Sequence, residues 1–403
     1  MSILRLPTYV SVLAVTTGAQ ALVSLAMLTP AAIAPAIAEG LGQPASKIGW
    51  WISFGYGGAM VTSLIGGNSV RRLGAARSTQ IGLVLAALGA AAMAMGSLPL
   101  AVLAALLIGL GYGMTNPAAS HLLAQTTSAK RRNLVFSLKQ TGVPLGGTMA
   151  GLIAPRLTQA WGWPTALLAV LVSCLGLALA LELVRRPWDN DRDPKARLSG
   201  NPFLGLALIW RNPRLKALSW TGFAYAAVQL SVSSFAVTML VTELSWSLVQ
   251  AGILLSALQV SGVIGRIVIG STADRFFGGV PTLVGLGAIT ACLALLTGTL
   301  SPHWPVLWVY AVLIPFGAAA LGWNGVYLAE LAHAAEPAQI PRVTGASLFF
   351  TYGGVLVGPP CFAALHDLVG SYTLTYALSA LPAVVGAAIL IWSNRQARPI
   401  LGA

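Results

Sequence analysis

Residues 217–242, ALSWTGFAYAAVQLSVSSFAVTMLVT, contain no Asp, Glu, Lys or Arg and lie between Lys216 and Glu243. A helix needs about 20 apolar residues to cross the hydrocarbon core of a membrane, so this stretch predicts one membrane span. The run is apolar throughout rather than alternating between apolar and polar residues, which argues against a strand of a membrane barrel. The fold therefore depends on how many such runs the chain contains.

Runs of the same kind recur along the whole chain. Those that hold one predicted span each are 6–38, 48–70, 157–181, 217–242, 244–265, 343–366 and 368–394. The runs 78–129 and 276–329 are twice as long, and turn signals at 97–99 and 301–305 divide each into two spans. Residues 134–155, interrupted by Lys139, complete the set. The sequence predicts an all-α membrane protein with twelve transmembrane helices.

The composition agrees with a membrane location. Of the 403 residues, 56% are hydrophobic and 8% are charged, whereas a soluble domain carries about 25% charged residues. The net charge is +13, but nucleic-acid binding needs basic residues gathered on one exposed face. Here the basic residues are separated by long apolar runs. We expect a lipid bilayer around the chain and no nucleic-acid partner.

The Lys and Arg residues also predict an orientation. If both termini are cytoplasmic, most cations fall in cytoplasmic segments, and the outer loops hold only Lys47 and Arg156. By this rule we expect a multi-pass protein of a bacterial inner (plasma) membrane. Two further cations, Lys139 and Arg266, lie inside predicted spans.

The longest polar segment separates six predicted spans from six. We expect an N-terminal bundle over 1–185, a cytoplasmic linker over 186–213 and a C-terminal bundle over 214–403. The two halves match at corresponding places: Gly67–Arg72 with Gly270–Arg275, Asn116 with Asn324, and Arg132 and Ser137 with Arg342 and Ser347. Matches in the same order suggest duplication, and repeated halves are typical of secondary transporters.

With six plus six helices, a central loop and the signature at Gly270, Asp274 and Arg275, the chain resembles the major facilitator superfamily over essentially its whole length. The resemblance implies two pseudo-symmetric six-helix bundles, alternating access and a monomeric carrier without a cofactor. It also implies that two loops help to close the cytoplasmic side. The candidate gating residues are therefore Gly67, Arg71, Arg72, Gly270, Asp274 and Arg275.

The first of these loops departs from the family pattern. Arg71 stands where the family usually has Asp, and a helix N-terminus stabilises an aspartate but not an arginine. In the second loop, Asp274 and Arg275 either take part in gating or form a solvated pair.

Signatures of enzyme chemistry are missing from the sequence. No Lys is followed by Ser or Thr, so there is no P-loop. Cys174, Cys292 and Cys361 lie on different predicted spans, without the spacing of a metal site or a disulfide framework. We expect no catalytic residues, no metal and no enzyme activity. A membrane receptor or membrane enzyme would also need a sensor domain or a catalytic grouping that the loops do not supply.

Arg266 precedes Asp274 by eight residues, which places it about 12 Å along the helix from the loop. A charged residue at that depth normally faces a cavity or a partner. Arg266 could bind an anionic substrate, pair with an acid or cap backbone carbonyls. No Asp or Glu falls in the middle of a predicted span, so a substrate carboxylate is favoured, held in bidentate geometry.

Lys139 lies nearer the inner end of its span. It could contact the substrate or set the charge of a cavity, or it could extend its amine to water. Because both buried charges are positive, an anionic ligand is favoured over a cationic drug.

The position of Arg266 is similar to that of the arginine that binds substrate carboxylate in the monocarboxylate and oxalate–formate carriers of this superfamily. The resemblance therefore assigns that role to Arg266. The second lysine that oxalate carriers place in the eleventh helix is missing, because Phe349 and Tyr352 occupy this region. A monocarboxylate or an aromatic acid is the expected substrate.

Other polar or aromatic residues in the helices that line the family's cavity are further candidate substrate contacts, or else form hydrogen bonds between helices. They are Thr17, Gln20, Tyr112, Asn116, Gln229, Asn324, Tyr327 and Tyr352. His121, one turn beyond Asn116, is a candidate proton carrier or a packed or capping histidine.

The sequence thus predicts a secondary active transporter of a small organic anion, held mainly by Arg266 and driven by symport with protons. Anion exchange stays open, and a sodium site built from carboxylates is disfavoured. The alternatives are multidrug or metabolite efflux by proton antiport and a carrier of neutral solutes. Efflux of cationic drugs predicts a buried acid and a basic residue in the fourth span, but 100–125 contains neither Lys nor Arg.

Overall fold

The computed structural model describes residues 8–127, 132–195, 203–336 and 339–396, and these contain no strand. The chain is 89% helical, so the predicted all-α class is confirmed. Long apolar runs become helices in a membrane because only a helix satisfies every backbone N–H and C=O group within one segment. The helices form two compact units.

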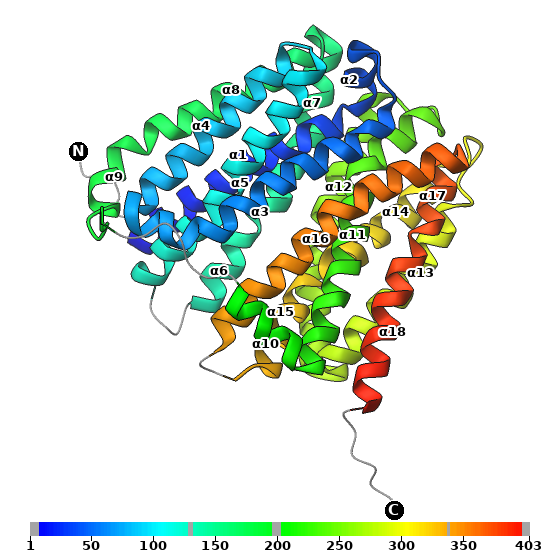
Figure 1. The fold of residues 1–403 in the computed structure, drawn as a ribbon. Coiled ribbons are helices and arrows are strands. Elements are labelled where there is room, and N and C mark those ends of the chain that lie inside the picture. Colours follow the sequence, from blue (N-terminus) through cyan, green and yellow to red (C-terminus); the bar gives the residue numbers. More distant parts are fainter. Residues whose placement is uncertain (1–7, 128–131, 196–202, 337–338, 397–403) are drawn as a thin grey trace, which may run out of the picture. The chain divides into compact units, whose positions relative to one another are not determined.

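The first unit comprises Met1–Gln43 and Phe54–Gly200 (Figure 1). Its helices are α1 (Thr8–Ala32), α2 (Ala34–Leu41), most of α3 (Ile48–Leu73), α4 (Ala75–Ala94), α5 (Leu98–Thr126), α6 (Arg132–Gln140), α7 (Gly142–Trp161), α8 (Trp163–Ala180) and α9 (Glu182–Trp188). Helix α1 packs against α5 and α7, and α4 packs against α5 and α8.

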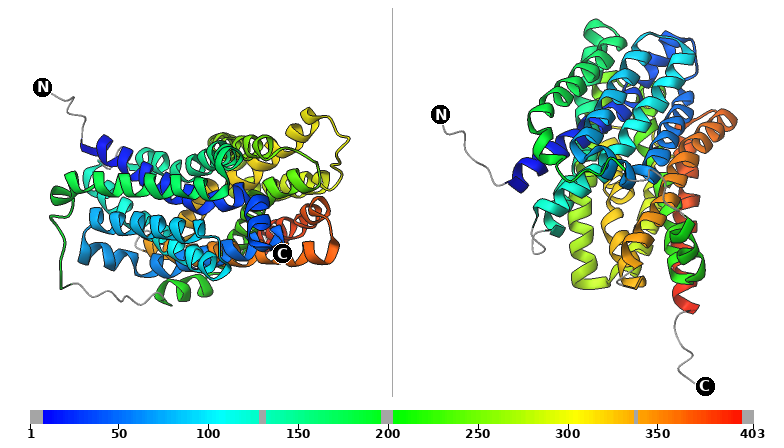
Figure 2. Two further views of the ribbon diagram at one scale, coloured as in Figure 1. Left: turned by 90° about the horizontal axis from the view of Figure 1, so that it is seen from above. Right: turned by 60° about the vertical axis from the view of Figure 1, so that its left-hand side comes forward.

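The second unit comprises Pro44–Ser53 and Asn201–Ala403. It contains the 3-10 turn η1 (Ala45–Lys47), the first turns of α3, α10 (Phe203–Arg211), α11 (Pro213–Thr242), α12 (Leu248–Thr272), the π-helical turn η3 (Ala273–Phe277), α13 (Gly279–Thr297), α14 (Val306–Gly322), α15 (Asn324–Ala334), α16 (Ile340–Val369), α17 (Tyr372–Leu378) and α18 (Ala380–Gln396). Within each unit, the helices run alongside one another in both views of Figure 2.

Ten helices are long and apolar enough to cross a membrane among the described residues. The two other predicted spans correspond to α3 and to the pair α6 and α7, so the arrangement fits the expected twelve. Both predicted turns occur, between α4 and α5 and between α13 and α14. His366 lies in the last turn of α16.

The fifth and the tenth predicted spans are among those that the structure divides into two helices. The fifth breaks between α6 and α7, where Pro144 has no N–H to donate to the carbonyl of Gln140. The tenth breaks at Trp323, between α14 and α15. Each break lies beside residues that the sequence singled out.

Small residues allow the helices to approach one another closely. A Cβ atom at Gly111 on α5 would overlap the carbonyl of Gly82 on α4, and one at Gly146 on α7 would overlap the carbonyl of Ala21 on α1. In the second unit, Gly354 on α16 meets the backbone of Phe223 on α11 in the same way. These glycines are therefore fixed by packing between helices.

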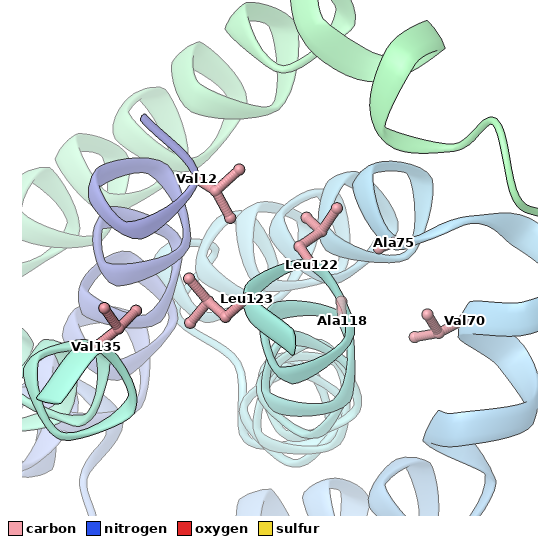
Figure 3. Close-up of a cluster of buried hydrophobic side chains, with 7 residues drawn as sticks. All are labelled: Val12, Val70, Ala75, Ala118, Leu122, Leu123 and Val135. Carbon is pink, nitrogen blue, oxygen red and sulfur yellow. The ribbon is translucent and has the colours of Figure 1, made fainter. Parts of the chain in front are cut away.

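One end of the first unit carries α9 and the turn between α3 and α4; we call it the linker end. Here the side chains of Val12, Val70, Ala75, Ala118, Leu122, Leu123 and Val135 form a buried cluster from five helices (Figure 3). Trp188 at the end of α9 packs against this cluster. The cluster anchors the segment that follows α9 to the ends of the other helices.

Candidate functional site

Lys139 lies on α6 and points into the first unit. The residue is only 2% exposed, so its amine does not extend to water. Its Nζ donates to Gln20 Oε1 on α1 at 3.1 Å and also to Asn116 Oδ1 on α5. A third and longer contact, of 3.5 Å, reaches Gln140 Oε1. Of the two predicted interpretations, the structure therefore shows a buried cation that binds neighbouring amides.

Gln20 forms the centre of this group, which we call the Lys139 cluster: Gln20, Thr115, Asn116 and Lys139. Gln20 is fully buried, and its Oε1 also accepts from Thr115 Oγ1 at 3.2 Å. The Nε2 of Gln20 is buried too, and it makes no hydrogen bond to the described part of the chain. The cluster thus contains one spare buried donor.

The junction of α6 and α7 brings Lys139 close to α1. A Cβ atom at Gly142 would lie 2.8 Å from the Thr17 carbonyl and 2.9 Å from Gln20 Cβ, so this position must be small. The helix break before Pro144 and the missing side chain at Gly142 together let α6 lean on α1. Local sequence therefore explains how the lysine reaches the interior.

The electrostatics of the cluster are unusual. Lys139 forms no salt bridge with any residue that the structure describes. Removing an ammonium from water costs several kcal/mol when no opposite charge compensates it. The three amide oxygens match the three N–H donors of the ammonium, but they carry no net charge. The cluster can therefore attract an anion.

A related arrangement occurs in the second unit. Gln229 Oε1 on α11 accepts from Trp323 Nε1 at 2.9 Å and from Asn324 Nδ2 at 3.1 Å. In the first unit, Thr115 donates to Gln20, and its chain neighbour Asn116 reaches the same group through Lys139. Sequence reasoning paired Asn116 with Asn324 but missed Trp323, whose buried indole N–H needs an acceptor.

The aromatic candidates serve packing in this structure. Tyr327 is 1% exposed and meets Trp323 edge-to-face at 5.1 Å, and Tyr112 meets Tyr56 edge-to-face at 5.6 Å. Tyr352 on α16 and Thr17 on α1 are partly exposed. Their roles as substrate contacts stay predictions.

Arg266 on α12 is partly buried, and its Nε donates to the Leu321 carbonyl at 3.1 Å. That carbonyl lies in the last turn of α14, just before the break at Trp323. The structure thus shows a contact of the third predicted kind, in which arginine caps a backbone carbonyl. The contact holds the guanidinium beside the broken tenth helix.

The candidate gating residues are mostly exposed. Asp274 and Arg275 lie in η3, and neither forms an ion pair with a described residue. Arg71 and Arg72 are exposed at the end of α3, and Gly270 has open space around it. The surroundings of Gly67 lie outside the described side chains. The gating roles stay predictions.

Sequence reasoning missed Asp189, which follows α9. Its Oδ1 accepts from the N–H of Ala76 at 2.7 Å and its Oδ2 from the N–H of Arg77 at 3.2 Å, so it caps the N-terminus of α4. Asp189 is 5% exposed, and burial raises the pKa of its carboxyl, although the two N–H groups act in the opposite direction. The N-terminus of α4 thus has a carboxylate beside it even though residue 71 is an arginine. This carboxylate belongs to the linker residue Asp189.

His121 also lies at the linker end. Its Nε2 is 2.6 Å from Asp191 Oδ2, and the same oxygen accepts from Gln125 Nε2 at 2.6 Å. Asp193 N donates to the carbonyl of Arg71 at 2.7 Å. Residues 188–193 therefore join the ends of α3, α4 and α5, and we call them the strap. His121 pairs with the strap here, and its role as a proton carrier stays a prediction.

Among the described residues, no group of three or more His, Cys, Asp or Glu side chains is placed to hold a metal ion.

A family model described as the Major Facilitator Superfamily matches residues 16–359. The chain belongs to this superfamily. The sequence-based resemblance is therefore confirmed, and the transporter class follows with it.

Relatives and solved structures agree with this assignment. This transporter is 26% identical to monocarboxylate transporter 13 of Bos taurus over 87% of its own chain and 80% of the relative. It is 25% identical to the gallate transporter of Pseudomonas putida, covering 91% of its own chain and 87% of the relative. The solved structure of a bacterial homolog of the human lysosomal transporter Spinster, inward-facing and occupied, has a TM-score of 0.79 at 14% identity and covers 97% of both chains. That likeness supports the fold alone.

Proposed function

We propose that this transporter carries a small organic anion, a monocarboxylate or an aromatic acid, by alternating access and in symport with protons. The observation that carries the proposal is the Lys139 cluster, where a 2% exposed ammonium has amide partners and no salt bridge within the described chain. A carboxylate that reaches Lys139 accepts a charge-assisted hydrogen bond from Nζ. It also neutralises a positive charge that no acidic residue of the described chain compensates.

Asn116 is the accessible member of the cluster. It is partly exposed, whereas Gln20, Thr115 and Lys139 are buried. Its Oδ1 binds Lys139, so an anion that displaces this amide would contact Nζ directly. An anion would therefore approach Lys139 at the side chain of Asn116.

Arg266 is the second proposed contact for the substrate. A guanidinium has five N–H donors, and the Nε donor is bonded to the Leu321 carbonyl. This bond fixes the plane of the group, and a planar donor set suits a carboxylate. Positioned in this way, Arg266 would supply orientation in addition to charge.

The names of the relatives favour the same substrate class. One is named for monocarboxylates and another for gallate, which is an aromatic carboxylate. We further propose a location in a bacterial inner membrane with both termini cytoplasmic, a monomeric carrier, and gating by Asp274 and Arg275. The Lys and Arg distribution supports this orientation.

The experiment is a binding and uptake screen of carboxylates. Purified protein is tested by thermal shift with L-lactate and gallate, and uptake is measured in proteoliposomes. We expect Lys139→Gln and Arg266→Gln to lower uptake about tenfold or more, because each loses a charge-assisted bond of about 1.5–3 kcal/mol. Lys216→Gln is the matched control, since Lys216 is exposed at the start of α11. Stabilisation by cationic drugs but by no carboxylate would replace the proposal with the efflux alternative.

A further inference from the structure

We propose that Lys139 carries the coupling proton, as an ammonium when the anion is bound and as a neutral amine when the site is empty. This inference rests on the proposed transport of an organic anion. It explains how a cluster that contains no carboxylic acid could couple transport to protons. Three observations support it, and they concern the partners of the amine, the spare donor on Gln20 and the neighbouring ionisable groups.

The protonated form fits the contacts in the structure. An ammonium has three N–H donors, and Nζ faces the amide oxygens of Gln20, Asn116 and Gln140. All three acceptors are neutral, so the charge itself is uncompensated. A bound carboxylate would provide the missing negative charge and stabilise the ammonium. Without an anion, the buried charge is costly, and release of its proton is favoured.

The neutral form fits the same cluster after one rotation. A neutral amine has two N–H donors and one lone pair, and Gln20 Nε2 is a buried donor with no partner among the described residues. Turning the Gln20 amide by 180° would place its NH2 group where Oε1 now lies. One N–H would then donate to the lone pair of Lys139, and the other would donate to Thr115 Oγ1.

Thr115 can follow this rotation because it has two acceptors available. Its hydroxyl lies 3.2 Å from Gln20 Oε1 and 2.9 Å from the carbonyl of Tyr112, and its one hydrogen can serve either. When Gln20 turns, Thr115 donates to Tyr112 and accepts from Gln20. The cluster can thus satisfy both protonation states of the lysine without moving a helix.

Other ionisable groups around α6 do not take over this role. Helices α1, α5 and α7 pack against α6. Their described ionisable residues are Tyr9 on α1, Tyr112 and His121 on α5, and Arg156 on α7; α6 itself adds Arg132, whose side chain is not described. None is a carboxylic acid, and His121 is engaged by Asp191 at the linker end. Lys139 is the ionisable group within the cluster.

The transport step balances in atoms and charge. On one side of the membrane, the neutral amine takes a proton from water, and the ammonium binds the carboxylate. On the other side, the carboxylate leaves and the proton returns to water. One proton and one monocarboxylate cross together, so no net charge moves. A pH gradient of one unit would then support about tenfold accumulation of the anion at equilibrium.

The first test counts protons directly. Calorimetric titration of gallate and L-lactate into the purified protein, in buffers of different ionisation enthalpy, measures the protons taken up per anion bound. We expect the wild type to take up close to one proton per anion bound at alkaline pH. Lys139→Arg should take up none, because arginine stays protonated. Anion binding by the wild type without proton uptake between pH 6 and 9 would overturn the inference but leave anion transport intact.

The second test measures coupling in proteoliposomes. We expect Lys139→Arg to retain exchange of the anion but to lose accumulation driven by a pH gradient, and its net uptake to respond to membrane potential. Gln20→Glu should also abolish pH-driven accumulation, because a fixed carboxylate would hold Lys139 as an ammonium. Lys47→Arg is the matched control at an exposed site.

The outcomes of this second test separate the two proposals. Accumulation by Lys139→Arg at the wild-type level would refute the proton role alone. Failure of the wild type to bind or transport any carboxylate would refute both proposals.

Discussion

The carboxylate of Asp189 lies against the backbone of Gly74, where α3 turns into α4. Gly74 has a φ of +95°, and a Cβ atom there would overlap the Asp189 carboxylate. Asp189 can therefore reach the N–H groups of Ala76 and Arg77 only because residue 74 has no side chain. The turn and its cap depend on each other.

The corresponding turn of the second unit has the same features. Gly278 precedes α13 with a φ of +76°, and a Cβ atom at Gly279 would overlap Oε1 of Glu330. Glu330 comes from α15, whereas Asp189 comes from the segment after α9. A glycine turn beside a carboxylate thus occurs in both units, with the carboxylate supplied by different segments.

Gly74→Ala should destabilise the protein. The positive φ costs about 1–2 kcal/mol for a residue with a Cβ atom, and the overlap with Asp189 adds to this cost. We expect a lower melting temperature in detergent and faster proteolysis of the strap. Gly176→Ala is the matched control, because Gly176 lies in a helix of the same unit with open space around it and without a positive φ. Equal melting temperatures for the two variants would contradict the proposed dependence.

The contact between Asp191 and His121 should make the strap sensitive to acid. Partial burial raises the pKa of Asp191, but the hydrogen bonds from His121 and Gln125 outweigh it and hold this pKa below its usual value. A carboxyl whose pKa is lowered by folding stabilises the fold above its unfolded pKa of about 4, and this contribution disappears as the pH falls through the folded pKa.

Asp191→Asn should therefore lower the melting temperature most above about pH 4, and the difference from wild type should shrink at lower pH. Melting curves between pH 3 and 8 measure this difference. Asp274→Asn is the control, because Asp274 is exposed and forms no ion pair with a described residue. A pH-independent difference for Asp191→Asn would count against the assignment.

Arg214 and Glu330 should show energetic coupling. Arg214 donates to Glu330 Oε2 at 2.9 Å, and the glutamate side chain is 9% exposed whereas that of the arginine is 51% exposed. Arg214→Met leaves a nearly buried carboxylate with His333, 3.5 Å from its other oxygen, as its remaining ion-pair partner in the described chain. We expect a loss of about 1–3 kcal/mol, which the double variant with Glu330→Gln partly restores. Additive effects in this double-mutant cycle would refute the coupling.

Gln229→Leu should destabilise the break in the tenth span. Its Oε1 accepts from both Trp323 and Asn324, and the Trp323 ring is 1% exposed. Removal of the acceptor leaves a buried indole N–H without a partner, at a cost of about 1–3 kcal/mol. Chemical unfolding followed by near-UV circular dichroism measures both the stability and the environment of the tryptophan. Gln229→Glu, which keeps an acceptor oxygen, should preserve the tryptophan signal.

The membrane helices and their turns were predictable from the sequence because they depend on local properties. A charge-free run of sufficient length must form a helix in lipid, and Pro and Gly near 97–99 and 301–305 interrupt such runs wherever they occur. The two cations within spans were visible for the same reason. Arg266 and Lys139 could be named as candidates before any contact was known.

The partners of these residues were decided by the tertiary structure. Gln20 and Lys139 are 119 positions apart, and Asp189 and Ala76 are 113 positions apart, so no local pattern connects them. The sequence left open whether Lys139 reaches water or the protein interior. The break before Pro144 and the close packing of Gly142 on α1 directed it inward, where the amine faces three amide oxygens. Sequence determined which charges lie within the predicted spans, and packing between helices determined which groups they contact.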